Sequence, residues 1–573
     1  MDKQPRLLSS KLFQKHRQVE VVLSRSVLYW KEIEKSRKRS SCTSRESETA
    51  HSHAVQVCEI VAVHKSEEDD QGDTKRGRLK KAKQQSQLYP HTFTVSYVRR
   101  TRQHQWRCSD VSFHCASQAL CQQWIQVINE QLSLLTNRPK RLLVYINPYG
   151  GKQQGKRIYE QKVAPLFRRA CISADVIVTE CANHARDHLK TEANLDKYDG
   201  VVCVGGDGMF SEIVHGLVTR TQTDHGVDQS RADAELVPCS LRIGIIPAGS
   251  TDCICFGTVG TNDPVTSALH IIVGDSQPMD VCSVHHGDVF LRYSVSLLGY
   301  GFYGDVLTDS ERKRWLGPAR YDLSGVKTFL SHNYYEGTVS YLPTADGLGN
   351  PRDKVQCRSG CHICQHKHSS KDKQWEMSEE EEKSDKDRWS TIHGKFIAIN
   401  AASMSCACPR SPKGLSPSAH LADGTTDLIL VRKCSRLDFF RHLLRHTNKD
   451  DQFDHSFVEV HRVRTFRFQP FQKQLVSRED PSEPPKKKGF SPMCSGQTTC
   501  NYSKAHSSWS CDGEILKHAA IQVSGYDVNM VKIEIPDKHH LTRSNHKEKL
   551  AVSSNISQLL AGNSYSCYSG TTL

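Results

Sequence analysis

The 573-residue sequence contains no run of apolar residues as long as a membrane-spanning helix requires. Its first residues, Met1-Asp-Lys-Gln-Pro-Arg6, also lack the apolar core of a signal peptide. With a hydrophobic content of 37 %, these absences predict a soluble, cytoplasmic protein. The 22 cysteines mostly stand singly in strand-like segments, and we therefore expect reduced thiols rather than a disulfide framework.

Acidic residues are too few to balance the basic ones. The sequence has 63 Asp and Glu against 77 Lys and Arg, and its formal net charge is +14. This excess favours an anionic partner, such as a nucleotide, phospholipid head groups or nucleic acid. Nucleic acid is disfavoured, because the basic residues are not interleaved with aromatic residues along a sheet.

Two common nucleotide-binding patterns are absent or incomplete. No spaced G-x-G-x-x-G motif is present, which argues against a dinucleotide-binding fold. The segment Gly150–Lys156 has most of the P-loop pattern, but Arg157 stands where Ser or Thr would bind magnesium. We therefore exclude a P-loop nucleotide hydrolase and retain only a glycine-rich turn that suits an anion.

The most informative stretch that is present runs from Val201 to Glu212. Its apolar start predicts a strand buried on both faces, followed by a glycine-bearing turn and a helix. Backbone N–H groups in such a turn can approach a phosphate. Asp207 in the turn would accept a proton from an attacking hydroxyl, reach a phosphate-bound magnesium, or simply cap the helix. The stretch alone leaves these alternatives open.

Similar turns follow other predicted strands. Asn147-Pro-Tyr-Gly-Gly follows the strand at 142–146, Thr179-Glu180 follows 174–178, and Pro247-Ala-Gly-Ser-Thr-Asp252 follows 241–246. The alternation of strands and helices predicts a doubly wound α/β domain over residues 139–277. In such folds ligands bind at the carboxyl edge of the parallel sheet, where these turns would meet.

Two further domains are predicted on either side. Residues 10–136 resemble a pleckstrin-homology domain, with short strands forming a β-barrel closed by a C-terminal amphipathic helix at 117–135. The basic turn Arg99–His104 would suit a phosphoinositide or another acidic head group, and the alternative is a solvated charged turn. Strands dominate 278–538, which predicts a β-rich domain with inserts at 344–390 and 475–505. A poorly ordered tail would occupy 539–573.

Taken together, the motifs resemble those of the diacylglycerol-kinase-type lipid kinases, a family that includes sphingosine and ceramide kinases. The resemblance covers residues 140–535 and rests on Asn147-Pro-x-Gly-Gly, Gly205-Gly-Asp-Gly208, Pro247-Ala-Gly-Ser250, Asp423-Gly-x-x-Asp427-Leu and Asp512-Gly-Glu514. The pleckstrin-like domain, the segment 310–317 and a group of three cysteines make it strongest to the ceramide-phosphorylating members. It implies a multidomain α+β protein, in which a phosphofructokinase-like α/β domain precedes a β-sandwich and ATP binds between them.

The resemblance also implies roles for individual residues. Asp207 would be the general base for the primary hydroxyl of ceramide, and Gly205, Gly206 and Gly208 would join it in contacting the substrate. ATP, with Mg²⁺, would be bound by a larger set: Asn147, Pro148, Tyr149, Thr179, Glu180, Cys181, Ala182, Asn183, Glu212, Gly249, Ser250, Thr251, Arg314, Arg320, Asp512, Gly513 and Glu514.

One departure from the family pattern bears on the substrate. Leu307 stands where sphingosine kinases carry a carboxylate that holds the substrate. Its loss favours a neutral amide over a cationic amine, because a buried unpaired charge is costly. Asp305 and Asp309 lie nearby in the sequence. A sphingosine or diacylglycerol kinase, and a non-catalytic lipid-binding scaffold, are the alternatives.

Two weaker patterns remain. Cys357, Cys361 and Cys364, near His362, His366 and His368, suggest zinc, but free thiols in a flexible loop are favoured because only three sulfurs are present. Leu430, Leu437 and Leu444 have the spacing of a calmodulin-binding helix, although a core strand followed by an ordinary helix is favoured. The resemblance further implies Ca²⁺ as an activator and a peripheral location at Golgi and plasma membranes.

Overall fold

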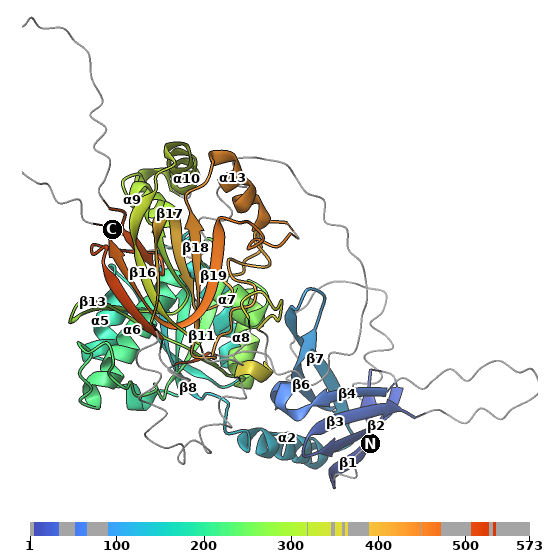
Figure 1. The fold of residues 1–573 in the computed structure, drawn as a ribbon. Coiled ribbons are helices and arrows are strands. Elements are labelled where there is room, and N and C mark those ends of the chain that lie inside the picture. Colours follow the sequence, from blue (N-terminus) through green and yellow to red (C-terminus); the bar gives the residue numbers. More distant parts are fainter. Residues whose placement is uncertain are drawn as a thin grey trace, which may run out of the picture.

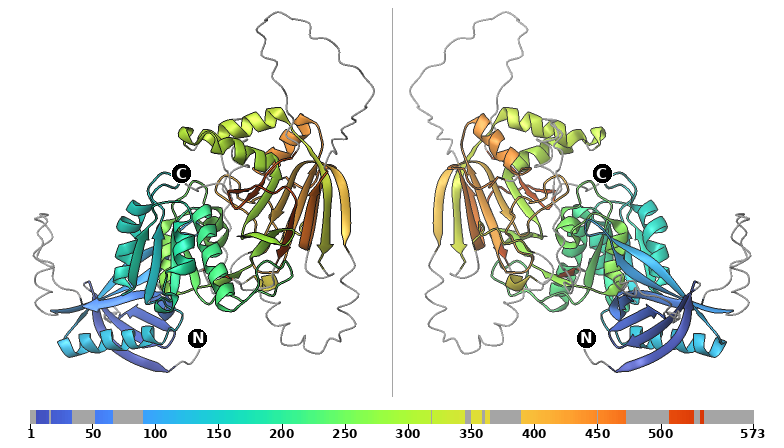
Figure 2. Two further views of the ribbon diagram at one scale, coloured as in Figure 1. Left: turned by 90° about the vertical axis from the view of Figure 1, so that its left-hand side faces the viewer. Right: turned by 90° about the vertical axis from the view of Figure 1, so that its right-hand side faces the viewer.

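The computed structural model describes residues 5–15, 17–33, 52–65, 90–317, 319–344, 350–357, 361–364, 389–448, 450–471, 506–525 and 531–533. They form three β-sheets with associated helices (Figure 1). In both side views the α/β domain lies between the N-terminal domain and the β-rich domain (Figure 2). None of the described helices combines the length and apolarity needed to cross a bilayer. The predicted insert 475–505 and tail 539–573 fall outside the described residues, as does most of 344–390.

The N-terminal domain is a seven-stranded antiparallel sheet closed by one helix. Its strands lie in the order β4-β3-β2-β1-β7-β6-β5. They are β1 (Arg6–Gln14), β2 (Arg17–Ser24), β3 (Val27–Glu32), β4 (Ser52–Gln56), β5 (Ile60–Lys65), β6 (His91–Arg100) and β7 (Trp106–Cys115). The 3₁₀ turn η1 (Val57–Glu59) separates β4 from β5, since Val57 and Ile60, three residues apart, both point into the core.

Helix α2 (Gln118–Ser133) closes this domain as the sequence predicts. Ser117 caps it by accepting a hydrogen bond from the Leu120 amide. Trp124 is fully buried and stacks on Phe93, with ring centroids 5.9 Å apart. The apolar face of α2 therefore fills the centre of the sheet.

The hairpin of β6 and β7 also contacts the α/β domain. The Trp106 amide donates to Thr266 Oγ1 at 2.9 Å, and Arg107 forms an ion pair with Asp263 at 2.6 Å. The Trp106 ring packs on His270. These contacts fix the N-terminal domain against helix α8 (Pro264–Val273).

The α/β domain contains a six-stranded sheet in the order β12-β23-β11-β10-β8-β9. Its strands are β8 (Arg141–Ile146), β9 (Ser173–Val178), β10 (Gly200–Gly205), β11 (Arg242–Pro247), β12 (Gln277–Met279) and β23 (Val531–Ile533). Strand β23, in the region 278–538 that the sequence assigns to the β-rich domain, pairs in parallel with β11 and extends this sheet; the domain bounds stay a prediction. No local pattern in so short a strand identifies its distant partner.

Helices connect and cover these strands, as expected for a doubly wound fold. They are α3 (Gly155–Ile158), the π turn η2 (Tyr159–Val163), α4 (Ala164–Arg169), α5 (His184–Thr191), the 3₁₀ turn η3 (Leu195–Lys197), α6 (Asp207–Asp224), α7 (Cys253–Val259) and α8. The helical segment between β8 and β9 is thus divided into α3, η2 and α4, and Pro165 occupies the first turn of α4, where its missing amide costs no hydrogen bond.

The β-rich domain is a ten-stranded sheet that folds back on itself. It comprises β13 (Cys282–His286), β14 (Val289–Ser294), β15 (Leu297–Gly301), β16 (Tyr335–Pro343), β17 (Ser390–Ala402), β18 (Thr426–Arg432), β19 (Val458–Pro470), β20 (Trp509–Cys511), β21 (Glu514–Leu516) and β22 (Ile521–Gly525). Strands β16 and β18 each pair with both β17 and β19. These four strands thus form a closed ring of pairings. The core of the domain contains the packed aromatic side chains of Tyr300, Phe468 and Trp509.

Three helices gather at one end of this domain, at the top of Figure 1. They are α9 (Phe302–Glu311), α10 (Ala319–Ser331) and α13 (Arg436–Arg445), and the 3₁₀ turn η4 (Arg314–Leu316) joins the first two. Phe439 of α13 packs against Phe302 of α9, with ring centroids 5.1 Å apart.

The proposed calmodulin-binding helix over 430–444 is not a single helix. Leu430 is buried in the centre of β18, and only Leu437 and Leu444 lie on α13. The alternative of a core strand followed by an amphipathic helix is therefore confirmed. Binding of calmodulin to all three leucines would require β18 to leave the sheet.

Candidate active site

The ends of four parallel strands meet at one edge of the α/β sheet. Pairing sets Val204 of β10 opposite Ile146 of β8, and Ile146 opposite Val178 of β9. On the other side of β10, Gly205 is opposite Pro247 of β11. The turns that the sequence singled out therefore emerge side by side, as expected for a doubly wound sheet.

Backbone hydrogen bonds hold these turns together. The Asn147 amide donates to Val204 O at 3.0 Å, the Ala248 amide to Gly205 O at 3.0 Å, and the Thr179 amide to Ile146 O at 2.9 Å. Each bond continues the ladder one step beyond a strand. The first residue of each turn is thus fixed by the sheet rather than by its own loop.

The turn after β8 is shaped by Asn147. Its Oδ1 accepts hydrogen bonds from the amides of Tyr149 and Gly150 at 2.9 and 3.0 Å. Gly151 has a φ of +57°, and a Cβ there would lie 2.7 Å from Ala248 O. Glycine is therefore required for this turn to approach the 248–249 turn. Tyr149 remains exposed beside them.

Asp207 is the first residue of α6 and is completely buried. Its Oδ2 accepts a hydrogen bond from the Cys253 amide at 3.0 Å, and its Oδ1 accepts one from the Ile254 amide at 2.8 Å. Both donors begin helix α7, so Asp207 caps the neighbouring helix instead of its own. These two hydrogen bonds orient the Asp207 carboxylate within the site.

Glu212, one turn further along α6, holds the start of α5. Its Oε1 accepts hydrogen bonds from the amides of Ala185 and Arg186 at 3.0 and 3.4 Å. Burial raises the pKa of Glu212, although these amides partly offset the effect. Asn183, just before α5, has a left-handed backbone with a φ of +65°. Thr179, Glu180, Cys181, Ala182 and Asn183 thus lie in the turn between β9 and α5.

Asp252 is the residue that sequence reasoning missed. It ends the Gly249-Ser-Thr turn, and its Oδ1 accepts a hydrogen bond from the Gly249 amide at 2.9 Å. Burial raises its pKa to about 7, although this hydrogen bond lowers it. A carboxylate directly after a strand-ending turn was the only sequence signal for it.

Three of these carboxylates act on one buried thiol. Burial raises the pKa of the Cys203 thiol, and the charges of Asp252, Glu212 and Asp207 raise it further. Negative charge is therefore concentrated on the buried side of the turns.

Asp512, directly after β20, is hydrogen-bonded to helix α6. Its carboxylate accepts hydrogen bonds from the amides of Val295, Ser296 and Leu297 and from the hydroxyls of Ser211, Ser294 and Ser296, at 2.8–3.2 Å. This cluster lies where the chain passes from β14 to β15. Because its oxygens already bind this set of donors, Asp512 positions the site. Direct nucleotide binding by Asp512 stays a prediction.

Glu514, the second acidic residue of the Asp512-Gly-Glu514 motif, also has a charged partner. Glu514 forms an ion pair with Arg292, whose guanidinium additionally donates to Ser211 Oγ at 3.3 Å. Gly513 has a φ of +92°, which permits the tight turn between β20 and β21. The Asp512-Gly-Glu514 motif therefore joins the β-rich domain to α6.

Arg314 and Arg320 are not brought to the glycine turns by any hydrogen bond or ion pair among the described residues. Both pair with Glu311, and Arg320 also lies over the ring of Tyr321. Binding of ATP by Arg314 and Arg320 stays a prediction. It requires both guanidinium groups to break their ion pairs with Glu311.

Comparison with known proteins agrees with this arrangement. The family models named "Ceramide kinase PH domain", "Diacylglycerol kinase catalytic domain" and "Ceramide kinase C-terminal domain" match residues 8–128, 141–284 and 296–533. Ceramide kinase of Homo sapiens is 55 % identical over 478 residues, covering 82 % of this chain and 86 % of the relative. That of Mus musculus is 52 % identical, covering 83 % and 88 %. The chain belongs to the ceramide kinase family.

Leu307 is the position at which sphingosine kinases are expected to carry a substrate-binding carboxylate. This side chain is buried in α9. Asp305 nearby accepts hydrogen bonds from Ser507 Oγ at 2.8 Å and from the Tyr335 hydroxyl. Asp309 forms ion pairs with Lys313 and Lys327. Burial raises the pKa of Asp309, but these pairs bring it down to about 2. Both carboxylates near Leu307 are therefore already engaged.

We expect Asp512→Asn to weaken the junction between α6 and the β-rich domain. Asn tolerates the left-handed backbone at position 512, where φ is +47°, but its amide group cannot accept all of the bonds made by the carboxylate. Unsatisfied buried amides should lower the free energy of unfolding by about 2–4 kcal/mol in urea titrations. Hydrogen exchange at residues 295–297 should accelerate.

Ser211→Ala is the matched control for this change. It removes one of the hydroxyl donors to Asp512 and leaves the three backbone bonds intact. Its effect should stay within about 1 kcal/mol. Equal exchange rates at 295–297 in Asp512→Asn and in the unmodified protein would contradict the role assigned to Asp512.

Proposed function

We propose that this protein is an ATP-dependent lipid kinase that phosphorylates the primary hydroxyl of ceramide, giving ceramide 1-phosphate and ADP. The observation that carries the proposal is the position of Asp207, which is buried at the sheet edge where three glycine-bearing turns follow parallel strands. The named relatives and the matched catalytic model support the same reaction. The buried site argues against the alternative of a non-catalytic lipid-binding scaffold.

The side chains and turns divide the work as follows. Asp207 accepts the proton of the ceramide hydroxyl as the hydroxyl oxygen attacks the γ-phosphorus of ATP. A new O–P bond forms, the bond between the γ-phosphorus and the β,γ-bridging oxygen breaks, and ADP leaves with that oxygen. Phosphoryl transfer depends mainly on positioning and on neutralising charge. The amides of the 147–151 and 248–252 turns, and the N-terminus of α6, suit the phosphates.

A divalent cation such as Mg²⁺ is part of the proposal. Asp207, Asp252 and Glu212 are buried carboxylates on or beside the turns that would hold the phosphates, and one or more of them would bind the ion. A bound Mg²⁺ would supply charge neutralisation for the phosphate oxygens. Activation by Ca²⁺ stays a prediction.

Replacing the proposed base tests the mechanism. Asp207→Asn preserves the size of the side chain but removes the proton acceptor. We expect kcat to fall by about 10²–10⁴-fold, with only a small change in ATP affinity measured by equilibrium binding. Asp224→Asn, at the exposed end of the same helix, should leave kcat unchanged. If the Asp207→Asn variant turned over substrate at a near-normal rate, Asp207 would not be the base, and its role would be limited to capping α7.

Substrate preference follows from the surroundings of Leu307. A free amine bound near Leu307 would lack a counter-charge, because Asp305 and Asp309 are committed to other partners. Desolvating an unpaired ammonium group is unfavourable. The neutral amide of ceramide carries no such cost, and ceramide should therefore have a higher kcat/KM than sphingosine.

We expect Leu307→Asp to shift the ratio of kcat/KM values toward sphingosine. Leu307→Asn is the matched control, since it introduces a polar group of similar size without charge. Radiolabelled ATP assays of both lipids, in one detergent and at one pH, measure the ratio. Equal efficiencies of the unmodified enzyme toward sphingosine and ceramide would contradict the ceramide assignment and leave only a lipid kinase.

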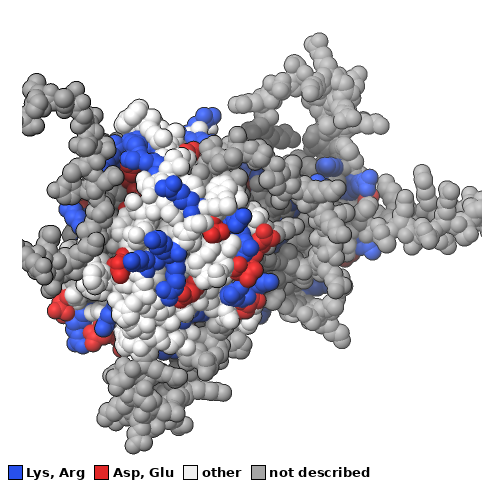
Figure 3. Space-filling model, turned by 45° about the horizontal axis from the view of Figure 1, so that its top comes forward, with Lys and Arg blue, Asp and Glu red and all other residues white. Residues whose placement is uncertain are grey.

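Access to a lipid substrate requires a surface that can contact the membrane. The face carrying α10 and α13 presents groups of Lys and Arg side chains, with Asp and Glu side chains beside some of them, separated by uncharged surface (Figure 3). Exposed apolar side chains on η4, α10 and α13 are Trp315, Leu323, Leu330 and Leu437. Trp315, which is 81 % exposed, suits the interface between head groups and acyl chains. We include peripheral binding to an anionic bilayer in the proposed function; the Golgi and plasma membranes, and calmodulin as a partner, stay predictions.

The basic turn of the N-terminal domain offers a second contact for acidic head groups. Arg100 is committed, because it pairs with Glu59 and lies over the Trp106 ring at 5.0 Å. Arg99 and Arg102 are exposed. Any binding of a phosphoinositide by this turn therefore depends on Arg99 and Arg102 rather than on all three arginines.

The double variant Arg99→Ala/Arg102→Ala should bind anionic liposomes more weakly. The expected loss is about 1 kcal/mol for each charge near the surface, and it should shrink at high salt. Arg6→Ala/Lys11→Ala removes the same charge from exposed positions of β1 and should have a smaller effect in the same sedimentation assay. Unchanged, salt-independent binding by the first variant would assign docking to the face of α10 and α13.

A further inference from the structure

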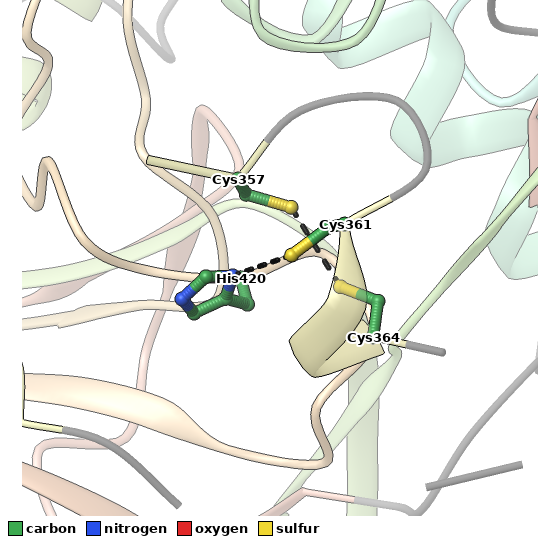
Figure 4. Close-up of side chains that lie close together, drawn as sticks. All are labelled: Cys357, Cys361, Cys364 and His420. Atoms are coloured by element: carbon green, nitrogen blue, oxygen red, sulfur yellow. Dashed lines mark hydrogen bonds between the residues drawn. The ribbon is translucent and has the colours of Figure 1, made fainter. Parts of the chain in front are cut away.

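Three cysteines and a histidine from two distant segments converge beside the β-rich domain. They are Cys357, Cys361, Cys364 and His420, and their ligand atoms all lie within 4.8 Å of one another (Figure 4). The Sγ atoms of Cys357 and Cys364 are 3.7 Å apart, and Cys361 Sγ is 3.3 Å from His420 Nδ1. His420 supplies a fourth potential metal ligand, which the three cysteines alone do not provide.

These distances match a tetrahedral metal site. With Zn–S bonds of about 2.3 Å and a Zn–N bond of about 2.05 Å, two sulfurs lie about 3.8 Å apart, and a sulfur and a nitrogen about 3.6 Å apart. A disulfide would require a sulfur separation of about 2.05 Å. All three cysteines are free thiols. The side chains are thus arranged around a common centre rather than bonded in pairs.

The surroundings also suit a buried metal. Cys361, Cys364 and His420 are buried, and Cys357 is partly buried. Cys357 Sγ accepts a hydrogen bond from the Leu421 amide at 3.4 Å, the kind of outer contact that orients a thiolate ligand. Among the described residues, apolar packing around the cysteines is slight, since their cluster adds Ala422 and Ile363 alone. Side-chain packing alone gives a weak reason for these groups to meet.

We propose that Cys357, Cys361, Cys364 and His420 bind a structural Zn²⁺ ion. Three thiolates and an imidazole complete the coordination, which leaves no position for a substrate, so the site is not catalytic. Binding releases the three thiol protons to solvent and involves no oxidation or reduction.

The ion would fix the loop that carries His420. The next residue, Leu421, accepts a hydrogen bond through its carbonyl from the Asp280 amide at 2.7 Å, and the Gly424 amide donates to Asp280 Oδ2 at 2.6 Å. Asp280 lies between β12 and β13, where the chain passes from the α/β sheet to the β-rich domain. Zinc would therefore stabilise the connection between the two domains that carry the proposed active site.

Metal content of the purified full-length protein is the direct test. Protein produced with zinc available should contain about one zinc ion per chain by mass spectrometry of the elements. Exchange for Co²⁺ should give the absorption bands of a tetrahedral thiolate complex. Zinc-free protein would overturn the proposal, and so would a native Cys357–Cys364 disulfide found by alkylation and peptide mass spectrometry.

Variants locate the ion independently of activity. His420→Ala should raise the Kd for zinc by at least about tenfold in chelator competition, and it should alter the Co²⁺ spectrum because water replaces imidazole. Cys361→Ser should release zinc at lower chelator concentrations than the unmodified protein. Cys434→Ser, at a thiol outside the cluster, should retain zinc fully. Unchanged zinc affinity in both His420→Ala and Cys361→Ser would place the metal elsewhere and overturn the proposal.

Discussion

The parallel pairing of β8, β9, β10 and β11 is the constraint on which the proposed active site depends. Because their ends are in register, the turns at Asn147, Thr179, Gly205 and Ala248 start from adjacent ladder positions. A shift of one residue would turn every buried side chain of a strand to the other face. Both faces of β8 and β10 are buried, so such a shift would force every side chain of these strands to repack against a different layer. The geometry of the turns is thus a consequence of packing inside the sheet.

The carboxylates of the site are held mainly by backbone amides. Asp207 binds the start of α7, Glu212 binds the start of α5, and Asp512 binds the amides of 295–297. Helix N-termini stabilise negative charge through their unpaired amides and dipole. Charge is therefore compensated by fixed groups, which cannot swing away to bind phosphate. A site built in this way holds its carboxylates in fixed orientations.

The sequence predicted the local features of this arrangement better than the distant ones. Glycine turns after apolar runs located the ligand edge, and Asp207 was identified from its neighbours. The sequence could not identify β23 as a strand of the α/β sheet, His420 as a partner of the three cysteines, or Arg100 as a partner of Glu59. Each of these depends on contacts between segments far apart in the chain, for which spacing and periodicity carry no signal. Asp252 was missed for another reason: its unusual environment arises from burial, which a turn sequence does not reveal.

The motifs that led to the family differ in what they do in the structure. Asn147-Pro-x-Gly-Gly and Gly205-Gly-Asp-Gly208 line the edge where the turns meet. Asp427, in contrast, forms a buried ion pair with Arg462 at 2.8 Å and accepts a hydrogen bond from Ser416 Oγ at 2.6 Å. Removing one partner of such a pair leaves an uncompensated buried charge, which would be strongly destabilising. The Asp423-Gly-x-x-Asp427 motif thus has a structural role. Gly424 in its loop is hydrogen-bonded to Asp280, and the motif begins three residues after His420 of the proposed metal site. A motif can therefore mark a residue that positions the chemistry as readily as one that performs it.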